Sequence, residues 1–240
     1  MNNYNTLQFE KDLKAMNITL SNKQIEQFLI YYEMLVEWNE VMNLTAITEY
    51  EEVMKKHFLD SITLNQAFDV TKECTVIDVG CGAGFPGLAL KIAYPNLKIT
   101  LLDSLNKRIN FLNAVIDKLG LTDIETVHGR AEDFAKAGKL RETFDVAVSR
   151  AVANLSTLSE YCLPYVKVGG YFIPYKSEKV RSEIEAAGKA LSILGGSIEK
   201  KIEFTLPDTD YYRNLLLIKK NKPTPNKYPR KAGLPSKEPI

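Results

Sequence analysis

Residues 76–87 of this chain, Val76-Ile77-Asp78-Val79-Gly80-Cys81-Gly82-Ala83-Gly84-Phe85-Pro86-Gly87, decide its fold. A run of apolar and β-branched residues leads into a cluster of glycines, and an apolar helical pattern follows at once. This order predicts a strand, a tight turn and the start of a helix. Glycine permits a sharp turn and a close approach of another molecule, and the amides at a helix start favour a polar or anionic group. The segment is therefore predicted to hold a small molecule.

Two classes of cofactor compete for this glycine turn. Gly82-x-Gly84-x-x-Gly87 matches the dinucleotide fingerprint, and Asp103 lies near the spacing of a ribose-binding acid. Asp78, however, precedes the first glycine, and this arrangement resembles motif I of class I S-adenosylmethionine (SAM) methyltransferases. Such a carboxylate can face the cationic end of SAM, whereas it would repel a pyrophosphate. SAM is therefore favoured over NAD or FAD, and a purely structural glycine turn is the third reading.

The composition indicates one moderate globular domain. The chain has 240 residues, of which 45% are hydrophobic, and this suffices for a core. The sequence has neither a charged-then-apolar leader nor a long uncharged apolar run, so we expect a soluble, cytoplasmic protein with no membrane partner. The three cysteines form no Cys-x-x-Cys pair and only two histidines are present, so we expect buried thiols and no metal. A monomer is also expected.

The net charge of +1 hides an uneven distribution. Residues 219–240 contain seven basic residues and one acidic residue, which leaves 24 basic and 29 acidic residues in positions 1–218. Half of the ten prolines also lie in this tail, so it is predicted to be extended rather than helical. A basic tail on an acidic body points to nucleic acid. A disordered, solubilising end is the alternative.

Residues 1–70 are predicted to form a helical extension. Ser21-x-x-Gln24 and Thr48-x-x-Glu51 are candidate capping boxes, and apolar residues recur at helical spacing after each of them. Residues 71–220 are predicted to form the SAM-binding domain, and residues 221–240 the basic, proline-rich tail.

From Cys74 onward, strand-like runs alternate with helical runs. The alternation predicts an α/β fold with a mostly parallel sheet, and the Rossmann-like, seven-stranded sheet of class I SAM methyltransferases, with its antiparallel last strand, fits it. Helices are expected over Leu105–Leu119, Leu155–Val166 and Glu178–Leu194. Strands are expected over Thr75–Val79, Lys98–Asp103, Ile124–His128, Phe144–Ser149, Gly170–Tyr175, Ile198–Leu206 and Leu215–Lys219.

Ligands of such sheets bind beyond the carboxyl ends of the strands, so the residues found there form the candidate site. Asp103 ends the second strand, where its carboxylate can accept both ribose hydroxyl protons; a helix N-cap is the alternative. Glu132 follows the third strand and could meet the adenine amino group, or belong to an ordinary acidic turn. Arg150 closes the fourth strand, and a buried strand-end cation must be paired or face a ligand. Its partner could be Asp78, the SAM carboxylate or an RNA phosphate. Lys176, after the fifth strand, could contact a substrate phosphate or be solvated.

Several motifs extend beyond the glycine turn. They are Trp38-Asn39 with Asn43-Leu44-Thr45-Ala46-Ile47, His57-Phe58-Leu59-Asp60-Ser61, Gly129-Arg130-Ala131-Glu132, Ser149-Arg150-Ala151-Val152-Ala153 and Tyr228-Pro229-Arg230-Lys231-Ala232-Gly233. Together with residues 78–87, this set resembles the ribosomal RNA small subunit methyltransferase G family, also called glucose-inhibited division protein B. The motifs follow the order of the family and cover nearly the whole chain.

This resemblance implies an enzyme that transfers a methyl group from SAM to N7 of a guanine in bacterial 16S rRNA. Because guanine N7 has a lone pair and no proton, no catalytic acid or base is expected. The open alternatives are a class I methyltransferase for another RNA, a protein or a small molecule, and a non-catalytic SAM-binding ribosome-assembly factor. By position, the SAM contacts of the family fall on Gly80, Phe85, Ala131, Glu132 and Arg150, and the class I pattern adds Asp78, Gly82, Gly84 and Asp103.

The expected partner is 16S rRNA or the small ribosomal subunit, with Lys176, Arg230 and Lys231 on its phosphates. Removal of residues 223–240 is therefore expected to weaken RNA binding and to leave SAM binding nearly unchanged. Asn43 and His57 are further candidates for the border of the site, although a lone helical histidine is more often structural.

Overall fold

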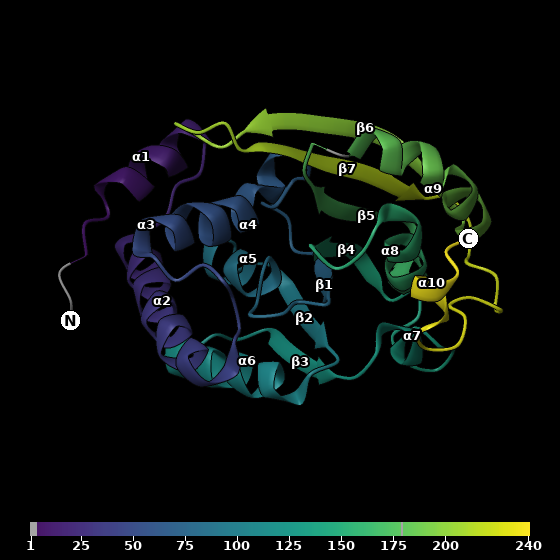
Figure 1. Ribbon diagram of the computed structural model, residues 1–240, viewed down its shortest axis with the longest axis horizontal. Coiled ribbons are helices and arrows are strands. Elements are labelled where there is room, and N and C mark those ends of the chain that lie inside the picture. Colours follow the sequence, from purple (N-terminus) through teal and green to yellow (C-terminus); the bar gives the residue numbers. More distant parts are fainter. Residues whose placement is uncertain (1–3, 179) are drawn as a thin grey trace.

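The computed structural model describes residues 4–178 and 180–240, and its centre is a twisted seven-stranded sheet with helices on both faces (Figure 1). The strand order is β3-β2-β1-β4-β5-β7-β6. The first five strands of this order run parallel, and β7 and β6 are antiparallel to their neighbours. The strands are β1 (Thr75–Val79), β2 (Lys98–Asp103), β3 (Ile124–His128), β4 (Phe144–Arg150), β5 (Val166–Lys176), β6 (Gly196–Thr205) and β7 (Tyr212–Lys220).

The predicted order of strands and longer helices is confirmed, the short helix α7 (Ala131–Phe134) was not predicted, and the other errors lie at element ends. The expected helix over Leu155–Val166 is too long. Helix α8 covers Leu155–Cys162, a 3₁₀ turn (η3) covers Leu163–Tyr165, and Val166 already belongs to β5. Pro164 explains the difference, because proline cannot donate the helical hydrogen bond and disfavours the helical conformation of the residue before it.

Alternate residues of the strands face two separate cores. Val76 of β1 packs in the core that contains α2 (Asn22–Met42), α5 (Gly87–Ala93) and α6 (Asn106–Leu119). Its neighbour Ile77 packs in the opposite core with α8 and α9 (Val180–Leu194). This follows from the strand geometry, in which successive side chains point to opposite faces. The short helix α7 (Ala131–Phe134) follows β3 on the second face.

The N-terminal helices include one feature that the sequence pattern did not indicate. After α1 (Leu7–Ala15) and α2, one continuous helical segment runs from α3 (Tyr50–Glu52) through a π-helical stretch, η1 (Val53–Leu59), to α4 (Asp60–Ile62), and a 3₁₀ turn, η2 (Thr63–Gln66), follows. The capping box at Ser21 and Gln24 is confirmed. The one at Thr48 is wrong, because the helix begins one residue later, after an extended Glu49 with no side-chain cap.

These N-terminal helices share their core with the sheet. Phe28, Tyr31 and Phe58 are fully buried in the same cluster as Val76 and Leu101 of the central strands. The Tyr31 hydroxyl also donates to the Ala83 carbonyl inside the glycine turn. The helical extension is therefore packed against the α/β domain as one layer of it, while the division of the chain at residue 70 stays a prediction.

The C-terminal tail runs back over the protein beside α7 and α8 (Figure 1). Only residues Leu234–Lys237 form a short helix, α10, and the remainder of residues 221–240 has no regular structure. The expected non-helical backbone is thus largely correct. The tail is nevertheless fixed to the domain, since the Arg141 guanidinium donates to the carbonyls of Thr224 and Tyr228.

Truncation of one N-terminal side chain tests this shared core. Phe58→Ala should reduce the free energy of unfolding by about 3–5 kcal/mol, because it removes a fully buried ring and leaves a cavity. The loss should appear as one cooperative transition in urea, monitored both by the single tryptophan and by circular dichroism. Val41→Ala, at a position with 80% exposure, is the control and should leave the midpoint nearly unchanged. Two separate transitions would contradict a shared core.

Candidate cofactor and substrate site

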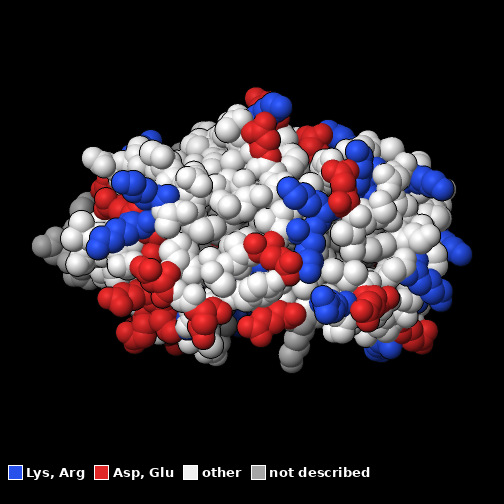
Figure 2. Space-filling view, turned by 90° about the horizontal axis from the view of Figure 1, so that it is seen from above, with Lys and Arg blue, Asp and Glu red and all other residues white. Residues whose placement is uncertain are grey.

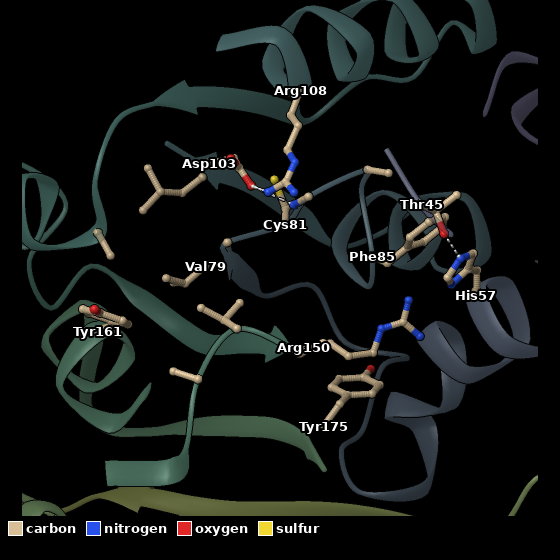
Figure 3. Close-up of a pocket in the computed structure, with 18 of the residues that line it drawn as sticks. Thr45, His57, Val79, Cys81, Phe85, Asp103, Arg108, Arg150, Tyr161 and Tyr175 are labelled. Atoms are coloured by element: carbon tan, nitrogen blue, oxygen red, sulfur yellow. Dashed lines mark hydrogen bonds and ion pairs between the residues drawn. The ribbon is translucent and has the colours of Figure 1, made fainter. Parts of the chain in front are cut away.

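A cavity of about 1080 Å³ opens at the carboxyl ends of β1, β2 and β4 (Figure 3). This is the position where the strand order reverses direction, between β1 and β4. The glycine turn after β1 forms its floor. The other walls come from the segments after β2, β3, β4 and β5, from the N-terminal helices and from the start of β7.

The glycine turn is held from below by Asp78. This side chain is fully buried, and its Oδ2 accepts the Gly87 N–H at 2.7 Å, while Oδ1 has no hydrogen-bond partner among the residues that the structure describes. Asp78 is not among the residues that line the cavity. The sequence-based interpretation had this carboxylate facing the cofactor, whereas in the structure it stabilises the start of α5. Burial raises the pKa of Asp78 to about 7.

The glycines of the turn have different surroundings. Gly82 lines the cavity with φ near +59°, and an added Cβ would meet nothing within 4 Å, so the floor is open at this point. Gly84 points the other way, and a Cβ there would lie 2.5 Å from the Tyr31 hydroxyl. Gly84 is thus a packing glycine outside the lining, whereas Gly80, Gly82 and Phe85 line the cavity as predicted for a binding loop.

Asp103 lies at the cavity wall with an exposed fraction of only 3%. Its Oδ2 accepts the Gly82 N–H at 2.9 Å and pairs with Arg108 at 3.2 Å, and its Oδ1 accepts the Leu105 N–H at 2.9 Å. Because a carboxylate has about four acceptor positions, Asp103 can still accept from a ligand. Asp103 also has part of the helix-capping role considered as its alternative, since its bond to the Leu105 N–H supports the chain just before α6.

Ala131 and Glu132 also line the wall of the cavity, and so does Tyr161 of α8, which is labelled in Figure 3. Glu132 is 4% exposed, and its Oε1 accepts the N–H of Gly233 from the C-terminal tail at 2.7 Å. A segment about a hundred residues further along the sequence therefore holds Glu132 in place.

Arg150 is paired with Asp60, an acid that the sequence analysis did not consider as its partner. The Arg150 Nη1 lies 2.8 Å from Asp60 Oδ2 and 3.2 Å from the Lys56 carbonyl oxygen. Asp60 is 3% exposed, and its other oxygen accepts from Arg213 Nε at 2.8 Å. One buried carboxylate thus connects the N-terminal helices with the end of β4 and the start of β7.

Aromatic rings form a flat surface beside Arg150. The guanidinium lies 5.3 Å from the centre of the Phe85 ring, and His57 stacks on the same ring at 4.5 Å with an interplanar angle of 16° (Figure 3). Thr45 Oγ1 is 2.8 Å from His57 Nε2. Burial, followed by the positive charge of Arg150, lowers the pKa of His57 to about 4, so this imidazole is neutral at pH 7. Of the two further candidates for the border of the site, His57 lines the cavity and Asn43 does not.

The three lysine and arginine residues expected on RNA phosphates have different surroundings. Lys176 lines the cavity, but its Nζ is held by the Ala153 carbonyl and by Glu183 at 2.7 Å. Arg230 lies outside the cavity and is paired with Glu160 at 2.7 Å. Lys231 also lies outside the lining, and it is exposed on the tail.

Strand-end reasoning missed the residues that enter the cavity from other directions. Lys56 comes from the π-helical stretch, and Tyr211 and Arg213 come from the start of β7. Because β7 is antiparallel, its amino end lies at the edge where the parallel strands have their carboxyl ends. A search that included the beginnings of antiparallel strands would have found Arg213.

Within residues 4–178 and 180–240, no group of three or more His, Cys, Asp or Glu side chains could hold a metal ion. The same residues contain no helix that is both long and apolar enough to cross a membrane.

The buried Asp78 predicts a specific pH dependence of stability. Its pKa of about 7 exceeds the ordinary value of 3.8, so between these values the folded chain keeps a proton that the unfolded chain has lost. The resulting stabilisation is full below pH 3.8 and is lost as the pH rises through 7. From pH 6 to pH 9 the free energy of unfolding should fall by about 1–2 kcal/mol from this group alone.

Urea titrations at both pH values test this expectation. Asp78→Asn should remove most of the decrease, whereas Asp69→Asn is the control, because hydrogen bonds to Thr71 lower the pKa of Asp69 and keep its titration outside this range. If the free energy of unfolding falls by the same amount from pH 6 to pH 9 in the wild type and in Asp78→Asn, Asp78 is already ionised at pH 6.

Comparison with solved structures identifies the fold. A SAM-dependent methyltransferase from Aquifex aeolicus superposes with a TM-score of 0.54 at 19% identity, over 73% of this chain and 96% of that chain. The fibrillarin pre-rRNA processing protein of Methanococcus jannaschii has a TM-score of 0.51 at 12% identity, over 68% of this chain and 76% of its own. The predicted class I methyltransferase fold is thus confirmed, and SAM, the predicted cofactor, agrees with it.

Comparison of sequences identifies the family. The family model of rRNA small subunit methyltransferase G (GidB) matches residues 24–209. The ribosomal RNA small subunit methyltransferase G of Lachnoclostridium phytofermentans is 57% identical over 97% of this chain and 96% of its own length. The protein of the same description from Bacillus cereus is 54% identical over 98% and 99%. With matches of this extent, the chain belongs to the rRNA small subunit methyltransferase G family.

Proposed function

We propose that this protein transfers a methyl group from SAM to N7 of a guanine in bacterial 16S rRNA. The observation that carries the proposal is a single cavity with two chemically different regions, in a member of this family. One region has the glycine turn with the carboxylates of Asp103 and Glu132, and the other has His57 and the cation Arg213. A cavity of about 1080 Å³ has room for a cofactor together with an acceptor base.

The first region has the polar groups that SAM requires. The remaining acceptor position of Asp103 would take one ribose hydroxyl, and the carboxylate of Glu132 would accept from the adenine amino group. Gly82 leaves open space on the cavity floor, so the backbone can be approached closely. When bound, SAM supplies an electrophilic methyl group on a sulfonium.

Arg150 would hold the carboxylate of the amino-acid end of SAM. In the described part of the chain, only its Nη1 has hydrogen-bond acceptors, which are Asp60 and the Lys56 carbonyl. The remaining N–H groups are thus able to form a charge-assisted pair with a ligand carboxylate. Asp60 would orient the guanidinium for this role, because it is itself buried and also held by Arg213.

The second region would receive the guanine. The stacked rings of His57 and Phe85 offer a flat apolar surface next to Arg150, and bases stack well on such surfaces. N7 has a lone pair and needs no deprotonation, so a neutral His57 serves as a surface and a hydrogen-bonding group rather than as a base. The contribution of the protein is then the alignment of methyl donor and acceptor.

Phosphate contacts would come from cations that keep an accessible face. Lys56 and Arg213 line the cavity beside Tyr211, with 24% and 22% of their side chains exposed, and Lys231 is exposed on the tail. Lys176 and Arg230 are weaker candidates, because the side chain of Lys176 is only 9% exposed and Arg230 lies outside the cavity, held by both oxygens of Glu160. On the face that includes β6 and β7, Asp and Glu gather toward one corner and Lys and Arg are interspersed with acids elsewhere (Figure 2).

N7 lies in the major groove of RNA, which is too narrow for side chains in a regular A-form helix. The target guanine should therefore be unpaired, or distorted by its ribosomal context. This requirement makes the small subunit itself a substrate to be tested beside naked rRNA.

Removal of the Arg150 guanidinium tests the cofactor assignment. Arg150→Ala should weaken SAM binding by roughly 10- to 100-fold, the effect of losing a charge-assisted hydrogen-bonded pair of about 1.5–3 kcal/mol. Isothermal titration calorimetry measures this affinity directly. Arg181→Ala, an exposed residue of α9, is the control. Unchanged SAM affinity in Arg150→Ala would remove Arg150 from the proposed site.

Labelled methyl transfer tests the complete proposal. The wild type is incubated with methyl-labelled SAM and either naked 16S rRNA or intact small subunits, and the modified nucleotide is mapped by mass spectrometry. We expect one N7-methylguanine and a steep decrease of RNA binding with salt. Methylation of another atom or another molecule would replace guanine N7 by that acceptor. SAM binding without transfer to either substrate would favour a non-catalytic assembly factor.

A further inference from the structure

The C-terminal tail, residues 223–240, is attached to the protein by one strong buried ion pair. Arg230 donates to Glu160 through Nε at 3.0 Å and Nη2 at 2.7 Å, and its backbone N–H donates to the same carboxylate at 2.7 Å. The side chain of Glu160 is 1% exposed. A carboxylate so deeply buried requires a partner, so release of the tail would leave an unpaired charge inside α8.

Further contacts hold the tail on both sides of this pair. Thr157 Oγ1 donates to the Pro235 carbonyl at 3.0 Å, and Ser156 Oγ donates to the carbonyl of Ile240 at 3.2 Å. The Tyr228 ring is buried in the core of this face of the sheet. The tail is therefore held on α8 from Arg230 to Ile240.

Between these anchors, the tail contacts one residue of the cavity wall, Glu132. The Gly233 N–H donates to Glu132 Oε1 at 2.7 Å. Ser236 Oγ donates to the Gly233 carbonyl at 3.0 Å, and Tyr161 follows Glu160, the partner of Arg230, on α8. Glu132 and Tyr161 both line the cavity. The cavity side of this wall is thus open to a ligand, and the tail holds its opposite side.

We propose that Arg230 and Gly233 are positioning residues for the cofactor, which act through Glu132. The docked tail fixes one oxygen of the Glu132 carboxylate and leaves the other, Oε2, without a protein donor in the described residues. That free oxygen is the group available to the adenine amino group. The inference rests on the proposed location of the adenosine end of SAM, and it reverses the expectation that the tail contributes to RNA binding alone.

The proposal requires a reciprocal effect. If the docked tail strengthens SAM binding, SAM must stabilise the docked tail by the same factor, since the two equilibria are linked. In the full-length protein, saturating SAM should therefore slow amide hydrogen exchange in residues 230–240 relative to β6. Strand β6 lies at the far edge of the sheet and serves as the internal reference.

The matching experiment shortens the chain without leaving a buried charge unpaired. A chain that ends at Pro229 and carries Glu160→Gln should unfold cooperatively but bind SAM roughly tenfold more weakly or worse in calorimetry. The control is Lys237→Met in the full-length chain, which removes a positive charge from α10 at an exposed position. Its SAM affinity and tail exchange should equal those of the wild type.

Two results would overturn the proposal. One is unchanged SAM affinity in the shortened chain, and the other is tail exchange that does not respond to SAM. If the shortened chain fails to fold, the exchange measurement on the full-length protein decides alone.

Glu132→Gln separates this inference from the proposed function. If Glu132→Gln weakens SAM binding and the shortened chain does not, only the role of the tail is wrong. If Glu132→Gln has no effect, the adenosine end of SAM lies elsewhere.

Discussion

Buried carboxylates hold this protein together around its cavity, because an acid removed from water must be paired. Asp60 takes two arginines, and Glu160 takes the guanidinium and backbone N–H of Arg230. Asp78 and Glu132 each accept a backbone N–H from a glycine. Since an unpaired buried charge is strongly destabilising, Asp60, Glu132 and Glu160 each fix a segment that is distant in sequence, whereas Asp78 fixes the helix start that follows its own strand. The N-terminal helices, the glycine turn, β7 and the C-terminal tail are therefore held at one edge of the sheet.

This arrangement explains how a general fold acquires a particular site. The parallel strands and the glycine turn form a cofactor cradle that many methyltransferases share. The parts outside this common core supply the other walls, with His57 and Lys56 from the N-terminal helices and Arg213 from the start of β7. A substrate region built from such additions can differ between families while the cofactor region stays the same.

Most of the fold could be predicted because the strands are short and continuous. The limits of β1 and β2 follow directly from apolar runs bounded by glycine, asparagine and charged residues. Errors arose where two local signals competed. Pro164 ended α8 earlier than the apolar pattern implied, and the helix expected at Thr48 began after Glu49. A local cap stabilises a helix by only about 1 kcal/mol. The packing of the helical face that carries Phe58 therefore decides where this helix starts.

The candidate site divides in the same way. The sequence alone determined the glycine turn, the acid at the end of β2, the arginine at the end of β4 and the family, because these features are written in short motifs with fixed spacing. Only the tertiary structure decided which way each side chain points. Asp78 supports the turn from below, Arg150 pairs with Asp60, and Arg230 anchors the tail on Glu160. These partners are separated by up to 90 residues, and a pairing over such a distance is set by the packing of whole elements, which no local pattern of residues encodes.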